Sequence, residues 1–286
     1  MVAGTRWREW IARPGGIGAR SGRFCLVLAA FLAITFGSAA SARAGVFRVS
    51  PVQVFLSSTT RSALITVTND GTESIRFQVT AFTWAQSPEG EIQTSPTKDI
   101  VFFPDIFSLK GGQERKIRVG TTVETPAAEV SYRLFVEELP PLDKDKKDKE
   151  TPNVQLLTKM GIPIFLQPDN SRWHGSLSGK VEAGVFLISV KNEGNVFFVV
   201  ETVNVRALGK ADEVLFEKQT TGWYVLAGGV RVFDLPIPPE HCEKTKTFAL
   251  KVVTRKGARD KALEARIGML PGSCATNVAG TESSPR

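Results

Sequence analysis

The chain has 286 residues, of which 42% are hydrophobic and 23% are charged, and its formal net charge is +7. This length accommodates roughly one to three domains that each bury a core, and the composition excludes a largely disordered chain. The charge is concentrated at the start: residues 1–44 carry six Arg and one Glu, which leaves 30 basic and 28 acidic side chains in residues 45–286. The charge balance of the remaining chain therefore gives no support to nucleic-acid binding.

The first 44 residues have the pattern of a secretory signal peptide. An Arg-containing segment precedes an apolar run of 13 residues, 24–36, and small residues then lead to Ala44. Because spanning a bilayer takes about 20 apolar residues, a cleaved leader is favoured over a permanent membrane anchor. We expect cleavage after Ala44 and export to the periplasm.

From residue 46 onward, short runs of β-branched and aromatic residues alternate with Gly, Pro, Asn and Asp, which is typical of an all-β fold. The strands predicted in the first half are residues 52–56, 64–68, 75–84, 100–103, 115–119, 130–136 and 154–166. About seven strands in about 120 residues are what an immunoglobulin-like sandwich requires.

A weak internal repeat predicts a second sandwich of the same architecture. Residues 65–71 and 188–194 are each an alternating strand that runs into Asn, an acid and Gly. Such a turn tolerates positive φ at Asn and Gly, so the chain can reverse there into the next strand of a hairpin. The alternative is that two unrelated hairpins look alike, since Asn-x-Gly is a common turn.

The domain boundary is predicted at Gln167 and Pro168, because a proline cannot donate a ladder hydrogen bond and suits a hinge between sheets. The predicted organisation is a signal peptide, two sandwiches and a frayed tail, at residues 1–44, 45–167, 168–274 and 275–286. Residues 143–150 are all charged and should form a solvated loop, although a recruitment role for them stays open.

Two cysteines, Cys242 and Cys274, remain after removal of the leader. Disulfides persist in secreted and periplasmic proteins, so a single bridge between them is expected. Two free thiols are the alternative, because the sequence does not show whether the two Cα atoms come within bonding distance.

Motifs of catalysis and metal binding are missing from the sequence: it has no Gly-x-Ser-x-Gly elbow, Walker loop, His-Glu-x-x-His or Gly-x-Gly-x-x-Gly after a strand. The two histidines, His174 and His241, have no clustered acids or thiols beside them. We expect no enzymatic activity, no cofactor and no metal. A secreted hydrolase would need residues scattered along the chain.

Several segments together resemble one known family. These are residues 47–54, 81–84, 103–111, 129–141 and 161–165, among them Phe-Pro-Asp at 103–105 and Glu-Val-Ser-Tyr-Arg-Leu at 129–134. They resemble the PapD-like periplasmic pilus chaperones of chaperone-usher systems, in particular the archaic branch. The resemblance implies two immunoglobulin-like Greek-key sandwiches in a boomerang arrangement. It also implies that the first sandwich lends its last strand to fibre subunits, which an outer-membrane usher then receives.

One segment suits this strand-lending role independently of the resemblance. Alternate residues of the long predicted strand face the same side and could fill successive pockets of a partner. These predicted donor residues are Val154, Leu156, Thr158, Met160 and Ile162. The competing interpretation is that they pack only in the protein's own core. The length of the strand and the charged loop before it favour an edge position.

The resemblance also implies a cleft that holds the subunit's C-terminal carboxylate with a basic pair. Gln53 and Pro163 stand at the corresponding positions here, so Gln53 offers a hydrogen bond without charge and Lys159 is an alternative cation. Glu129 matches the family's acidic interdomain residue, and we expect it to lie near Gln167 and Pro168.

The function predicted from all of this is a non-enzymatic periplasmic chaperone of fimbrial subunits that works by donor-strand complementation. The alternative is a secreted two-domain adhesive or binding module. The sandwich fold alone does not decide between them, because it hosts many functions.

Overall fold

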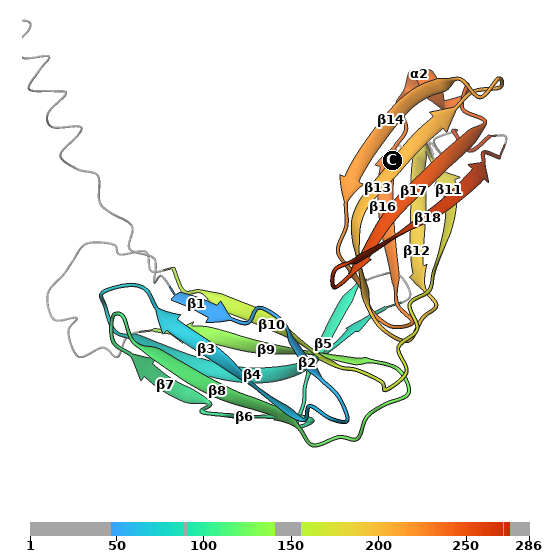
Figure 1. Ribbon diagram of the computed structural model, residues 1–286. Helices are drawn as coiled ribbons and strands as arrows, with labels where there is room; N and C mark the ends of the chain where they lie inside the picture. The colour runs from blue at the N-terminus through green and yellow to red at the C-terminus, as the bar shows by residue number, and fades with distance from the viewer. Residues whose placement is uncertain (1–46, 88–90, 141–155, 271, 275–286) are drawn as a thin grey trace, which may run out of the picture. The chain divides into compact units, whose positions relative to one another are not determined.

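The computed structural model describes residues 47–87, 91–140, 156–270 and 272–274. Two β-sandwiches follow one another along these residues (Figure 1). The expected all-β fold is confirmed, and no helix within the described ranges is long and apolar enough to cross a membrane.

The first sandwich consists of two sheets. One has the strand order β1 (Phe47–Ser50), β3 (Ser62–Asn69), β8 (Glu114–Thr121), β6 (Ile100–Phe103). The other has the order β2 (Val54–Leu56), β10 (Lys159–Leu166), β9 (Val130–Leu139), β4 (Ile75–Gln86), β5 (Ile92–Pro96), and β7 (Ile106–Leu109) also pairs with β4. Every strand pair is antiparallel except β2 with β10, which is parallel.

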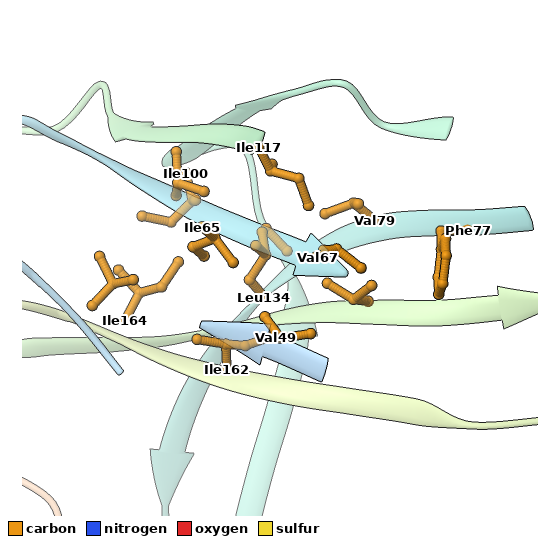
Figure 2. Close-up of a cluster of buried hydrophobic side chains, with 14 of the residues drawn as sticks. Val49, Ile65, Val67, Phe77, Val79, Ile100, Ile117, Leu134, Ile162 and Ile164 are labelled. Carbon is orange, nitrogen blue, oxygen red and sulfur yellow. The ribbon is translucent and has the colours of Figure 1, made fainter. Parts of the chain in front are cut away.

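Alternate residues of these strands fill the core between the two sheets (Figure 2). β4 shows the reason, since Phe77 and Val79 are buried while Arg76 and Gln78 on the other parity stay half-exposed. Period-2 alternation therefore places one side of each strand in the core, and burying a side chain of this size contributes about 1.5–3 kcal/mol.

The second sandwich repeats the two-sheet plan. Its smaller sheet has the order β11 (Gly175–Glu182), β12 (Val185–Asn192), β16 (Val230–Pro236). The other has the order β14 (Val214–Thr221), β13 (Phe198–Leu208), β17 (Thr247–Lys256), β18 (Arg259–Gly268), with β15 (Tyr224–Val225) pairing with β13. A short helix, α2 (Pro239–Cys242), precedes β17, and its Cys242 forms a disulfide with Cys274 across a Cα–Cα distance of 5.9 Å.

The Asn-acid-Gly repeat has the same local structure in both sandwiches. The side-chain amide of Asn69 donates to the carbonyls of Glu73 and Leu109, and that of Asn192 donates to the carbonyls of Val196 and Val225. Each Asn also accepts from the backbone N–H two residues later, at 3.0 and 2.9 Å. This shared arrangement of a fully buried Asn argues that the repeat is an architectural one.

The expected hairpin at this repeat is wrong. β3 and β4 lie in different sheets, as do β12 and β13, and the residues with positive φ do not include the Asn or Gly of either turn. The reason is that the Asn side chain itself bonds the backbone and turns the chain from one sheet to the other, so no left-handed residue is needed.

Candidate functional site

The edge of β10 is free over half of its length. β10 pairs with β9 from Lys159 to Leu166, but on its other side β2 covers only Ile164 to Leu166 (Figure 1). Residues 157–163 therefore have no neighbour on that side among the described strands. An uncovered edge of this kind is a template on which another extended chain can pair.

Two hydrogen bonds show which backbone groups point to this edge. The carbonyl of Thr158 accepts from Glu138 N–H on β9, whereas Gln167 N–H donates to the Leu56 carbonyl on the opposite side. Since the direction alternates along a strand, the odd-numbered residues Leu157, Lys159 and Gly161 present N–H and C=O to the free edge. Pro163 shares this direction, so its missing N–H costs no bond to β9.

The predicted donor residues do not share one environment. Leu156 is 65% exposed and Thr158 is half-exposed, while Met160 packs partly against the core and Ile162 is 1% exposed within it (Figure 2). Val154 lies outside the described residues. The donor role predicted for Ile162 is corrected here: its side chain already packs in the core between the two sheets, so it is not available to a partner.

A half-buried cation lies on the outer face of the sheet, next to the free edge. Arg133 is opposite Pro163 in the β9–β10 register, and its guanidinium carbon is 4.2 Å from the centroid of the Trp84 ring. Burial lowers the pKa of Arg133 below its ordinary value. Among the described residues, neither Arg133 Nε nor Trp84 Nε1 has a hydrogen-bond acceptor, although both atoms are buried.

A partly desolvated guanidinium stacked on an indole ring, with an unpaired N–H on each group, is suited to bind an anion. Buried polar groups are normally hydrogen-bonded, so these two donors mark an incomplete hydrogen-bonding environment beside the free edge. A carboxylate matches the fork of donors on an Arg side chain and gains the strength of a charge-assisted hydrogen bond.

The two anchor residues expected from the sequence have other partners. Gln53 donates to the Tyr224 hydroxyl, which links the first sandwich to the second. Lys159 lies 2.9 Å from Glu137 and its Nζ is 4.8 Å from the centroid of the Phe135 ring. Sequence reasoning missed Arg133, and the only signal in the sequence was an Arg on the outward parity of a strand beside the donor segment.

The predicted interdomain residue Glu129 links the two sandwiches, which belong to one compact unit. Its carboxylate accepts from Phe197 N–H at 2.9 Å and from Gln167 at 3.4 Å, and lies 3.5 Å from Lys256 Nζ. Pro168 is buried beside this link. A hydrophobic cluster of Trp84, Phe165, Phe197 and Leu226 packs next to it.

Burial dominates the protonation of this ion pair. It raises the pKa of Glu129 above 4.5, and it lowers the pKa of Lys256 below 10.5; in each case the opposite charge of the partner opposes the shift. The Glu129 carboxylate is 0% exposed and the Lys256 side chain 19%, so each group depends on the other to remain charged.

Lys256→Met should therefore destabilise the protein by about 3 kcal/mol at pH 7.5, because it leaves a buried carboxylate without its cation. The pKa of Glu129 is already raised, and it rises further in the variant. Protonation then relieves the cost, so the deficit shrinks as the pH falls from 7.5 towards 5. Urea unfolding at the two pH values measures this change.

Lys251→Met is the matched control. Lys251 pairs with Glu264 on the surface at 3.6 Å, with both side chains more than half exposed. Removing an exposed pair changes stability by about 0–1 kcal/mol. A loss for Lys256→Met that is the same at both pH values would contradict the burial argument.

Taken together, the fold and the site define a class: a protein of two immunoglobulin-like sandwiches with an open edge strand beside an unpaired cation. Residues 46–172 match the family model described as "Pili and flagellar-assembly chaperone, PapD N-terminal domain". Through these residues the chain is similar to the PapD-like pilus chaperones, which is the resemblance that the sequence predicted. This family consists of assembly chaperones and not of enzymes.

Solved structures show the same fold over both sandwiches. The CsuC-CsuE chaperone-tip adhesion subunit complex from the archaic Csu pili of Acinetobacter baumannii matches with a TM-score of 0.55 at 19% identity, covering 77% of this chain and 97% of that one. The SafA pilin–SafB chaperone complex of Salmonella enterica matches with a TM-score of 0.52 at 14% identity, covering 79% and 99%. The class 5 fimbriae chaperone CfaA matches with 0.51 at 16%, covering 79% and 100%. No curated protein sequence matches significantly.

Proposed function

We propose that this protein is a periplasmic chaperone that completes fimbrial subunits by adding its β10 edge to their unfinished sheet. The observation that carries the proposal is the edge left uncovered from residue 157 to residue 163, with N–H and C=O groups directed outward. A sandwich that lacks a strand exposes a hydrophobic groove and two unpaired edges, and an added strand supplies both backbone bonds and alternating side chains.

The position of β2 limits how far a bound strand can extend. β2 occupies the same edge of β10 from Ile164 onward, so a partner strand has to end at or before Pro163. Arg133 lies in that register, and a cation favours the carboxyl end of a chain. The partner strand would therefore run parallel to β10, with its terminal carboxylate on Arg133 and Trp84.

The donor side chains are those that precede the closed part of the sandwich. Leu156 and Thr158 project from the exposed start of the segment, and Val154, the remaining predicted donor residue, lies outside the described residues. An exposed Leu that pairs with a groove buries apolar area worth about 25 cal/mol per Å². Met160 packs partly against the core of the first sandwich, so only the exposed part of its side chain can contact a partner.

Export and delivery complete the proposal. The leader at residues 1–44 would direct the chain to the periplasm, and an outer-membrane usher would receive the loaded subunit. The archaic type of system is favoured by the sequence resemblance. No cofactor or nucleotide is needed, because folding of the subunit provides the driving force.

Co-expression in the periplasm tests this function. The tagged mature protein is expressed with the small secreted proteins encoded beside it, and the chains that co-elute are identified by mass spectrometry. The expected result is a 1:1 complex with a protein that lacks a final strand and is lost from the soluble fraction without this chaperone. Recovery of the protein alone, with its neighbours equally soluble in its absence, would favour the independent binding module.

A further inference from the structure

The outer face of β10 has a gap that a side chain from β9 fills. Gly161 pairs with Phe135 in the β9–β10 register, and a Cβ atom on Gly161 would lie 2.9 Å from Cε1 of the Phe135 ring. Real Cβ atoms do not approach a ring carbon so closely, so any larger residue at this position would displace the ring. Phe135 therefore extends over β10 towards the free edge.

The ring of Phe135 is held in place from two other sides. Phe82 on β4 makes an edge-to-face contact with it, with the ring centroids 5.5 Å apart, and Lys159 Nζ lies 4.8 Å from its centroid. Phe135 and Phe82 both remain partly exposed. The ring is thus an oriented apolar surface beside the edge on which a partner strand would pair.

Arg133 is the nearest charged group to the same gap. A Cβ atom on Gly161 would lie 3.8 Å from Nη1 of Arg133. A chain whose carboxylate reaches Arg133 along the β10 edge therefore places its last residue beside Gly161. In most sheets the side chain of this last residue would pack on the neighbouring side chain of β10. Gly161 has no side chain, so the last residue of the bound chain would instead contact the Phe135 ring.

We propose that the bound chain ends in a large apolar residue, preferably aromatic, whose side chain packs on Phe135 above Gly161. This inference rests on the proposed function and names the chemistry of the terminus that the site selects. Arg133 and Trp84 recognise the carboxylate, while Phe135 recognises the side chain of the same residue.

Four ten-residue peptides test the inference with the full mature protein. They share two N-terminal lysines followed by alternating Thr and Val, end in Phe or in Ser, and carry either a free carboxylate or an amide. Binding is followed by the NMR resonance of the Trp84 indole N–H, which lacks an acceptor within the described structure. The acid ending in Phe should bind about tenfold more tightly than the acid ending in Ser.

Phe135→Ala should remove this preference for Phe over Ser and keep the preference for acid over amide. Phe135→Leu retains an apolar side chain and should keep part of the preference for Phe. This intermediate result would show that the effect of Phe135→Ala comes from the lost apolar surface and not from misfolding. Phe103→Ala, a change at a Phe that is 76% exposed on the other sheet, is the matched control and should leave both preferences unchanged.

The experiment distinguishes failure of the side-chain inference from failure of the carboxylate anchor. Equal binding of the Phe and Ser acids, or a preference that survives Phe135→Ala, would overturn the inference and leave the proposed function intact. Equal binding of acid and amide, or no binding of any peptide at millimolar concentration, would contradict the carboxylate anchor and with it the proposed function.

Discussion

Arg133→Met should abolish recognition of a chain terminus while leaving the protein as stable as before. The guanidinium is desolvated and has no acidic partner in the described residues, so replacing it with an apolar side chain of similar length removes an unfavourable burial. In the complex the same group meets a carboxylate. Truncating one member of such a buried pair costs about 2–5 kcal/mol, which is a loss of at least about 30-fold in affinity.

The measurement compares the free-acid and amide peptides ending in Phe on the wild type and on the variant. The wild type should distinguish them strongly, and Arg133→Met should bind both with the same weak affinity. Arg118→Met is the control, since Arg118 is exposed on the other sheet of the first sandwich and pairs with Phe103 in the β6–β8 register. If Arg133→Met unfolds at lower urea while still distinguishing acid from amide, Arg133 is a structural residue and not an anchor.

Strand periodicity explains why most of the first sandwich could be predicted and three strands could not. The long runs of β-branched and aromatic residues became β3, β4, β8 and β9, because burial on one face enforces alternation. The missed strands β1, β5 and β7 are four or five residues long. β5 is exposed at every position, so it has no alternation to detect, and only its pairing with β4 makes it a strand.

Alternation also identifies which residues share a face but not what that face meets. Leu156, Thr158, Met160 and Ile162 do share a parity, yet Ile162 fills the core while Leu156 is exposed. The difference arises because the second sheet covers one end of β10 and not the other, which is a property of topology. For the same reason Arg133 could not be singled out: its isolation from acids depends on β4, β10 and β15 meeting around it.

The acidic residue of the interdomain ion pair was predicted from the sequence, but its basic partner was not. Glu129 was identified through the family resemblance, and Gln167 was expected to lie near it. The cation comes instead from Lys256, at the end of β17 and 127 positions further along the chain. Nothing in the local sequence distinguishes this Lys from exposed ones, because its burial follows from the packing of Phe197 against Phe165 across the two sandwiches.

Proline substitutions in β10 should have different effects at neighbouring positions. Alternate residues direct their backbone N–H groups either to the free edge, where a partner strand would pair, or to β9 within the protein. Lys159→Pro removes an N–H that points to the free edge, whereas Met160→Pro removes one that points to β9. Pro163 already occupies an edge-directed position of the same strand, so the fold tolerates proline there. Lys159→Pro should fold normally.

Recovery of the co-expressed subunit should fall at least tenfold with Lys159→Pro. One backbone hydrogen bond to the partner strand is lost, and the proline ring blocks close approach of that strand. Leaving one buried backbone group unsatisfied costs about 1–3 kcal/mol. Met160→Pro should instead lower the stability of the chaperone itself by a similar amount. Lys159→Ala separates the backbone from the side chain: its ion pair with Glu137 is about half exposed and its loss should matter little. Normal subunit recovery with Lys159→Pro would show that the edge of β10 is not the surface that pairs, and the donor role would then have to be sought on another strand.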